Sequence, residues 1–402
     1  MRYRRAAAKK KSRAQVMTPE VVARRAVEFI AGAGESWLEL GSGTGSLAAA
    51  CLEKADPESF IGVEIDQRLL QLGPQDPRAT FLRADVLRPQ ALAEVLGGGL
   101  FGRTVGNPPY GLRGLPLACQ RRLAELCPGI PQVMNWVQVD LYFVLESLAR
   151  LRRPSEAAFI VAAPLAADAG VTAFRRTLVT TASEVECFEL PGDTFGRKAE
   201  VQSYLLVARF GSSKPKLVRV GRLVGAALDV VDERWISLEQ AADRLDVGHY
   251  EFQELNRRLL KASGGSKLSS CGASVVRGSR TRAQFESMSV ECFHTTDFPS
   301  DGREVTFGRS RDFGFRLAEA GDVLLPRVGT RCLQREAIVT RGRRPYTEAV
   351  LRLRLPHGQA RRACDWMSSE DGTAWRRAAA RGSCAKHLTV ASILEMPTPW
   401  IA

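Results

Sequence analysis

The glycine-rich segment Leu38-Glu-Leu-Gly-Ser-Gly-Thr-Gly45 constrains the fold of this chain more than any other feature. It follows a short apolar run at 36–40 and precedes a helix-like run at 47–54. Glycines let the backbone turn sharply and approach a ligand closely, and the amides of a helix N-terminus lie nearby. The segment therefore predicts a strand, a tight turn and a helix that together cradle a ligand.

Strand-like and helix-like runs alternate through the first 210 residues. The expected strands cover 36–40, 60–64, 80–83, 103–106, 157–163 and 201–210, and the clearest helices cover 18–30, 47–54 and 139–151. Strands separated by helical segments favour parallel pairing with right-handed crossovers. We predict an α/β fold with a Rossmann-like, doubly wound and mostly parallel sheet.

The chain has 402 residues, which is too many for one ordinary core, so two domains are expected. The stretch GSSKPK at 211–216 has the Gly/Ser/Pro composition of a linker. We therefore predict a catalytic domain over 14–210 and a mixed α+β domain over 217–402. Residues 1–13 form a basic tail that we expect to be disordered.

Positive charge is distributed unevenly within a net charge of +13. Residues 1–13 carry +7, residues 14–210 carry −3, and residues 211–402 carry +9. Lysines and arginines displace condensed counterions from phosphates, so this distribution favours a polyanionic partner.

The nine cysteines are odd in number, and no pair has the C-x2-C spacing of a zinc site. We expect free thiols in a reducing compartment and no metal site. No apolar run reaches the roughly 18–20 residues of a membrane helix, so a cytoplasmic protein is predicted. All four histidines follow residue 240, so the first half must act without a histidine base.

Acidic residues at the ends of three expected strands point to the cofactor. Glu64 lies 19 residues after Gly45, where a carboxylate accepts hydrogen bonds from ribose hydroxyls, and Asp85 can meet an adenine amino group. Glu39 stands directly before the glycines, where it would repel a pyrophosphate but suits a cationic amino group. The pattern therefore favours S-adenosyl-L-methionine over NAD.

The tetrapeptide Asn107-Pro108-Pro109-Tyr110 follows the fourth expected strand. The prolines fix the backbone so that the Asn107 side-chain oxygen and the Pro108 carbonyl can accept from one amino group. The Tyr110 ring can stack on a planar base. In-line methyl transfer needs positioning more than a strong base, which agrees with the missing histidine.

In these residues the sequence resembles the γ class of amino-methyltransferases, which make N6-methyladenine in DNA. MTPEV at 17–21, LELGSGTGSL, GVEID, RADV, VGNPPYG and VDLYFVLESLARL follow in the order of that family. The resemblance implies that the cofactor is held by Thr18, Glu39, Gly41, Gly43, Gly45, Glu64, Asp85, Val86 and Asn107. It also implies that Asn107, Pro108 and Tyr110 hold the target base, and that the loop at 192–198, with Phe195 and Lys198, covers that base.

The second half has a looser likeness to DNA target-recognition domains. Residues 320–330 (AGDVLLPRVGT) resemble their GD-[IV]-L…R-x-GT segment, and 387–398 resemble their end. Arginines pair with phosphates and guanine edges. The candidate DNA-contacting residues are Arg327, Arg331, Arg341, Arg343 and Arg344.

Together these features predict a site-specific DNA adenine-N6 methyltransferase, the modification enzyme of a restriction-modification system. The expected setting is the nucleoid-associated cytoplasm of a bacterium, with a monomer acting on double-stranded DNA beside a cognate restriction endonuclease. Three alternatives stay open: an RNA adenine or protein glutamine methyltransferase, a catalytically silent DNA-binding subunit, and N4-cytosine as the product.

Overall fold

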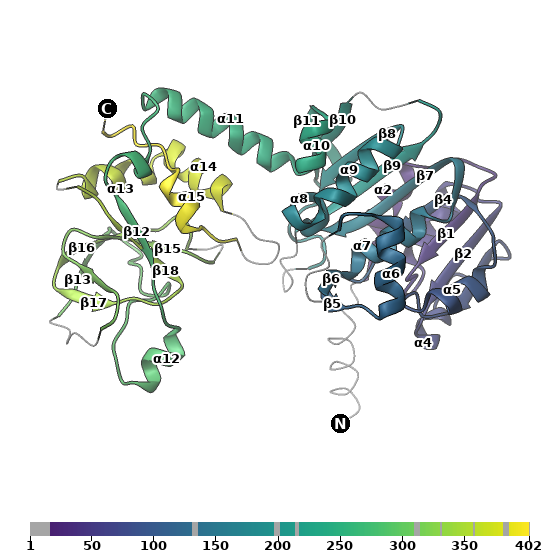
Figure 1. The fold of residues 1–402 in the computed structure, drawn as a ribbon, viewed down its shortest axis with the longest axis horizontal. Coiled ribbons are helices and arrows are strands. Elements are labelled where there is room, and N and C mark those ends of the chain that lie inside the picture. The colour runs from purple at the N-terminus through teal and green to yellow at the C-terminus, as the bar shows by residue number, and fades with distance from the viewer. Residues whose placement is uncertain are drawn as a thin grey trace. The chain divides into compact units, whose positions relative to one another are not determined.

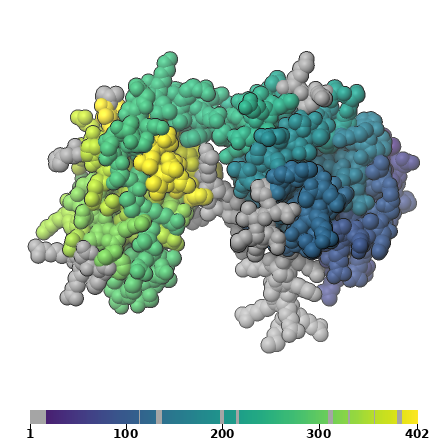
Figure 2. Space-filling model, in the orientation of Figure 1, coloured from purple at the N-terminus to yellow at the C-terminus, as the bar shows by residue number. Residues whose placement is uncertain are grey.

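The computed structural model of the protein describes residues 17–130, 136–196, 202–213, 217–308, 314–329, 332–356, 358–380 and 386–401. The chain divides into two compact units, Met1–Val247 and Gly248–Ala402 (Figure 1). Figure 2 shows the same chain as a space-filling surface, with purple to teal in the first unit and green to yellow in the second. Each unit has its own hydrophobic core.

The first unit is built on a nine-stranded sheet with the order β11-β10-β8-β9-β7-β4-β1-β2-β3. The strands are β1 (Ser36–Leu40), β2 (Ser59–Glu64), β3 (Ala79–Arg83), β4 (Phe101–Gly106), β7 (Leu151–Ala162), β8 (Glu184–Glu189), β9 (Ser203–Phe210), β10 (Leu217–Val224) and β11 (Asp229–Ser237). The run from β7 to β3 is parallel, whereas β9 is antiparallel to both of its neighbours. The predicted mostly parallel α/β sheet is therefore confirmed.

Helices connect these strands and cover the sheet (Figure 1). They are α2 (Glu20–Glu28), α3 (Ser46–Lys54), α4 (Gln67–Leu70), α5 (Pro89–Leu96), α6 (Leu117–Leu126), α7 (Val139–Leu148), α8 (Ala163–Ala167), α9 (Thr172–Thr181) and α10 (Leu238–Asp243). A short hairpin of β5 (Leu112–Gly114) and β6 (Trp136–Gln138) lies between β4 and α7. Every α7 residue from Val139 to Ser147 is buried, which explains its nearly continuous apolar sequence.

Strand β1 lies at the centre of the parallel part of the sheet. Its Leu38 pairs with Ile61 of β2 on one side and with Thr104 of β4 on the other. Trp37, Leu38 and Leu40 are buried, as expected for a strand covered on both faces. The carboxyl ends of β1 to β4 consequently meet at one edge of the sheet, where ligands bind in open α/β folds.

The predicted domain boundary at 211–216 is wrong, because the sheet continues beyond it. Strand β10 pairs with β8 from Arg219 opposite Glu186 to Arg222 opposite Glu189, and β11 pairs with β10. Alternating Val218, Val220 and Leu223 are buried on these strands. A Gly/Ser/Pro stretch breaks regular structure in the same way between two strands as between two domains, so its composition did not distinguish the two cases.

A buried arginine links the end of this unit to its core through hydrogen bonds. Arg175 on α9 has no exposed surface, and it donates to the carbonyls of Leu165 (3.2 Å), Ala242 (3.3 Å) and Asp243 (2.6 Å). The last two carbonyls lie at the C-terminal end of α10, whose unsatisfied acceptors need donors. The helix that follows β11 thus belongs to the first unit, and the unit ends near Val247.

The second unit has a mixed α+β fold around a five-stranded sheet with the order β12-β18-β15-β16-β13. The strands are β12 (Ser274–Arg277), β13 (Glu304–Thr306), β15 (Val323–Pro326), β16 (Ala337–Arg341) and β18 (Val350–Arg354), and a separate pair is formed by β14 (Leu317–Glu319) and β17 (Arg343–Pro345). The helices are α11 (Val247–Ala262), α12 (Arg282–Ser287), α13 (Ala360–Ser368), α14 (Glu370–Ala379) and α15 (Val390–Leu394). Among the described residues, no helix is both long and apolar enough to cross a membrane.

Candidate active site

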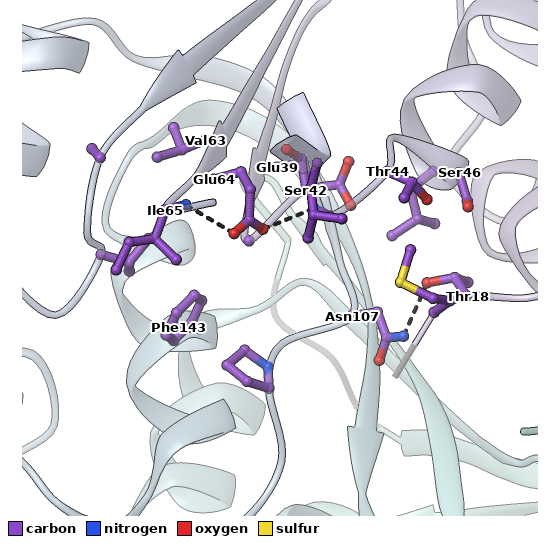
Figure 3. A pocket seen from close by; sticks show the side chains of 18 of the residues that line it. Thr18, Glu39, Ser42, Thr44, Ser46, Val63, Glu64, Ile65, Asn107 and Phe143 are labelled. Carbon is purple, nitrogen blue, oxygen red and sulfur yellow. Dashed lines mark hydrogen bonds between the residues drawn. The ribbon is translucent and has the colours of Figure 1, made fainter. Parts of the chain in front are cut away.

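A cavity of about 260 Å³ opens at the carboxyl ends of β1, β2, β3 and β4. Eight of the residues that the sequence assigned to the cofactor or the base line it: Thr18, Glu39, Gly41, Gly43, Glu64, Asp85, Val86 and Asn107. Figure 3 shows Glu39, Glu64, Thr18 and Asn107 around one space, although they come from segments far apart in the sequence.

The glycine turn forms one wall of this cavity. Gly41, Gly43 and Gly45 all have positive φ, at +83°, +57° and +78°, so each occupies a conformation that other residues rarely adopt. Gly41 and Gly43 line the cavity, whereas Gly45 does not. A Cβ at Gly45 would lie 2.7 Å from the Cδ atom of Pro74, so this glycine allows close packing away from the cavity. Contact of Gly45 with a cofactor stays a prediction.

The Glu64 carboxylate holds the glycine turn against the end of β2. One oxygen, Oε2, accepts from the Gly43 amide at 3.0 Å, and Oε1 accepts from the amides of Ile65 and Asp66 at 2.9 Å each. A carboxylate offers about four acceptor sites, so three protein donors leave capacity for a ligand hydroxyl. The side chain is only 6% exposed, which keeps competing water away.

The Glu39 carboxyl group is buried beside Glu64, and hydrogen bonds do not fully offset the cost of burying it. Its Oε2 atom has no hydrogen-bond partner among the described residues, and the residue is 3% exposed. Burial, and secondarily the charge of Glu64, raises the pKa of Glu39 well above its usual range. A buried acceptor of this kind favours a ligand that brings a positive, hydrogen-bond-donating group.

Asp85 and Val86 form the wall that follows β3. Asp85 Oδ1 accepts from the Leu87 amide at 3.0 Å, which fixes the turn, and the Val86 side chain is buried. A carboxylate beside an apolar side chain can serve both the amino edge and the face of a planar base. Val63 and Ile65 line the cavity beside Glu64, and Thr44 and Ser46 line it on the side of Thr18 (Figure 3).

Asn107 directly follows β4, and both polar atoms of its side-chain amide are hydrogen-bonded. Its Nδ2 donates to Thr18 Oγ1 at 2.9 Å, and its Oδ1 accepts from the Tyr110 hydroxyl at 2.8 Å. Asn107 and Pro109 line the cavity, but Pro108 and Tyr110 do not. The acceptor that the sequence assigned to a target amino group is therefore occupied by Tyr110 in this conformation.

The rings of Tyr110 and Phe195 are brought together although they are 85 residues apart. Their centroids are 6.4 Å apart and their planes are inclined at 75°, an edge-to-face contact. A base stacked between two rings needs them roughly parallel, so one of these rings must turn before a base can enter. Tyr110 is also largely buried, at 9% exposed.

The sequence analysis did not identify several residues around this site. Phe143 of α7 lies under Gly41, where a Cβ would be 3.2 Å from its ring. Asp140, also on α7, is fully buried, and burial raises its pKa to about 7. Its Oδ2 accepts from the Ala162 amide at 3.4 Å, while Oδ1 has no partner in the described part of the chain. Acidic residues in an otherwise mostly apolar helix, here Asp140 and Glu146, are the signal that could have found it.

Four of the candidate DNA-contacting arginines lie in the described part of the second unit. The fifth, Arg331, lies outside the described residues, as does Lys198 of the loop predicted to cover the base. Arg327 follows β15, and its Nε donates to the carbonyl of Glu348 at 2.9 Å. Arg344 pairs with Glu291 at 2.8 Å and lies over the Phe307 ring. Arg341 ends β16 and Arg343 begins β17, on either side of the turn between these strands.

No family model and no curated protein matches this chain. Among solved structures, the type IIG restriction endonuclease BpuSI is 12% identical, with a TM-score of 0.51 over 96% of this chain and 59% of its own. A modification subunit of a putative type I restriction enzyme from Vibrio vulnificus YJ016 is 18% identical, with a TM-score of 0.42 over 52% of this chain and 47% of its own.

A putative class I S-adenosylmethionine-dependent methyltransferase from Listeria monocytogenes is 19% identical, with a TM-score of 0.40 over 52% of this chain and 66% of its own. In all three comparisons this chain spans less than two thirds of the other protein's length. At identities this low the likeness concerns the fold, and the BpuSI match extends that likeness over nearly the whole chain.

Proposed function

We propose that this protein transfers the methyl group of S-adenosylmethionine to N6 of an adenine in double-stranded DNA, as the modification enzyme of a restriction-modification system. The observation that carries the proposal is the meeting of the glycine turn, two buried carboxyl groups and Asn107 around one cavity. The likeness of fold to BpuSI, a restriction endonuclease, supports the biological setting. We propose a monomer acting in the bacterial cytoplasm, close to the nucleoid, beside a cognate endonuclease.

The cavity suits this cofactor on chemical grounds. The unpartnered Glu39 oxygen fits the amino group of the methionine part, and the remaining acceptor capacity of Glu64 fits a ribose hydroxyl. Asp85 and Val86 would meet the adenine, and Thr18 would lie beside the methionine carboxylate. When bound, the cofactor supplies a sulfonium methyl group that an amine nitrogen can attack.

The protein's contribution to this reaction is positioning. The Asn107 side-chain oxygen and the Pro108 carbonyl would accept the two hydrogens of the target amino group and direct its nitrogen lone pair toward the methyl carbon. Asn107 Oδ1 has a second lone pair for the target amino group, and the Tyr110 hydroxyl frees the first when it turns to the Ile160 carbonyl, 3.5 Å away. The released Tyr110 ring and Phe195 can then stack on the flipped base.

The charge of the second unit favours a nucleic acid over a protein as the substrate. Residues 248–402 contain 25 basic and 16 acidic residues, a net charge of +9, whereas residues 14–247 carry −3. Extracting a base from a duplex costs a few kcal/mol, which a basic unit that grips the phosphates helps to offset.

The direct test supplies purified protein with methyl-labelled S-adenosylmethionine and offers unmethylated duplex DNA, duplex RNA or a soluble protein extract as the acceptor. We expect label in DNA, recovered as N6-methyladenine after digestion. Label in N4-methylcytosine would correct the base, and label confined to RNA or protein would refute a DNA substrate. Cofactor binding without transfer to any acceptor would instead indicate a silent subunit.

Replacing Glu64 with alanine should weaken binding of S-adenosylmethionine by about 1–3 kcal/mol, because the ribose loses its acceptor and the Gly43 amide loses its anchor. Isothermal calorimetry measures the change. Glu58→Ala, near the start of β2 and away from the cavity, is the control. Unchanged affinity in Glu64→Ala would contradict the assigned site.

The affinity for S-adenosylmethionine should rise with pH. The pKa of Glu39 is raised in the ligand-free protein, and a neutral carboxyl group must lose its proton to bind a cationic amino group. Binding measured from pH 5.5 to 8 should therefore release protons, and Glu39→Gln should flatten the pH dependence. A wild-type affinity independent of pH would exclude Glu39 as the partner of that amino group.

A further inference from the structure

Four arginines gather at one end of the five-stranded sheet in the second unit. Arg277 ends β12, Arg280 follows it, Arg316 directly precedes β14, and Arg327 directly follows β15. We call Arg277, Arg280, Arg316 and Arg327 the arginine cluster. The register explains the meeting, because Arg277 lies opposite Leu351 and Pro326 lies opposite Val350, both at the start of β18.

Glu348, in the turn before β18, is the centre of the cluster. Its carboxylate pairs with Arg277 Nη2 at 2.7 Å, and its carbonyl accepts from Arg277 Nε at 3.1 Å and from Arg327 Nε at 2.9 Å. The Glu348 amide donates to the Arg280 carbonyl at 2.8 Å, and Arg316 donates to the Arg277 carbonyl. Hydrogen bonds therefore connect each of the four arginine residues to Glu348 or to another member of the cluster.

A glycine allows the end of β12 to lie close to the turn that carries Glu348. Gly278 follows Arg277, and a Cβ there would lie 2.1 Å from the carbonyl oxygen of Thr347. Only a residue without a side chain lets the end of β12 lie so near the turn that carries Glu348. The arginines are thus positioned by backbone contacts as well as by their own side chains.

The cluster carries excess positive charge at the surface. In the part of the chain that the structure describes, Glu348 is the one carboxylate within ion-pair distance of any of the four arginines. Arg277, Arg280 and Arg316 are exposed and Arg327 is half-buried. Burial and the nearby charge of Arg277 lower the pKa of Arg327. Four guanidinium groups with one carboxylate make a surface that an external anion would stabilise.

We propose that the arginine cluster binds the phosphodiester backbone of duplex DNA, and that it positions the second unit on the DNA without reading bases. This inference rests on the proposed function, which supplies DNA as the partner. The sequence analysis selected Arg327 for DNA contact but did not identify its three companions.

The hydrogen bonds of Arg277 favour phosphate contact over base recognition. Arginine reads guanine with two adjacent N–H donors of one guanidinium group. Arg277 already uses Nε and Nη2 on Glu348, so its side-on pair of donors is committed, whereas Arg327 uses Nε alone on the same residue. Their remaining Nη atoms can still meet a phosphate oxygen. Held by backbone carbonyls, these side chains also lose less conformational freedom on binding.

The test measures DNA binding by the full chain at several salt concentrations, using fluorescence anisotropy. The variant R277Q/R327Q removes two charges from the cluster, and R361Q/R362Q removes two exposed charges from α13 as a matched control. We expect the slope of log affinity against log salt to decrease by about 2 in the cluster variant and to stay unchanged in the control. Duplexes with and without the methylated sequence should lose affinity by the same factor.

Cofactor binding and the thermal unfolding of each variant show whether both units stay folded. An unchanged slope in a folded cluster variant would overturn the proposal, as would an equal decrease in the control. Loss of discrimination between the two duplexes would assign base reading to these arginines, and equal competition by duplex RNA would overturn the choice of DNA. Failure of the wild-type protein to bind any duplex would contradict the proposed function itself.

Discussion

Asn107→Ala should reduce methyl transfer to DNA by at least about 100-fold, because the target amino group loses the acceptor that aligns its nitrogen. Affinity for S-adenosylmethionine should change by only several-fold, since Asn107 is one of many residues around the cavity. Single-turnover transfer of labelled methyl groups and calorimetry of cofactor binding measure the two effects separately.

A second variant separates this role from a structural one. Asn107 bonds to both Thr18 and Tyr110, so its loss also frees these two side chains. Thr18→Val removes the first bond while leaving the Asn107 oxygen in place, and at saturating cofactor concentration it should retain most of the transfer rate. Near-normal turnover in Asn107→Ala would refute the role given to the tetrapeptide.

Removing the second unit should abolish sequence-specific DNA binding and leave cofactor binding intact. A chain that ends at Val247 keeps the whole nine-stranded sheet and the bonds from Arg175 to the end of α10. Specific complexes with DNA exceed nonspecific ones by at least about 10³-fold in affinity, and a loss of that size is expected here. Anisotropy with a cognate duplex and calorimetry with the cofactor give the two readings.

A chain that ends after residue 216 provides the contrasting case. It lacks β10 and β11, exposes the edge of β8, and deprives the buried Arg175 of its acceptors on Ala242 and Asp243. Arg175 would keep only its bonds to Leu165 and Thr172. Removing partners from a buried charge costs several kcal/mol, so this shorter chain should unfold or aggregate. If it were as stable as the chain that ends at Val247, the boundary derived from the sheet would be wrong.

Retained sequence selectivity in the longer chain would contradict the assignment of DNA recognition to the second unit.

The parallel sheet could be predicted from the sequence because its signals are local. Apolar runs of strand length alternate with helical runs, and the glycine turn fixes the junction of β1 and α3. Once parallel strands are assumed, Glu39, Glu64, Asp85 and Asn107 must meet at one edge, and all four do line the cavity. Their roles toward a cofactor and a base remain predictions.

The features that could not be predicted from the sequence depend on distant contacts. The end of the first unit is fixed by β10 pairing with β8 and by Arg175 reaching α10, and neither pairing leaves a local pattern. Gly45 looks equivalent to Gly41 in the sequence, yet it packs against Pro74. The bond between Tyr110 and Asn107 depends on side-chain rotamers, which residue spacing does not determine.

The most direct test of the central claim expresses the protein in a bacterial host without adenine methylation and maps modified bases by single-molecule sequencing. The proposed function predicts N6-methyladenine at one short sequence throughout the genome, and none in cells that express Asn107→Ala at the same level. Unmodified DNA in cells that contain soluble, cofactor-binding wild-type protein would contradict it.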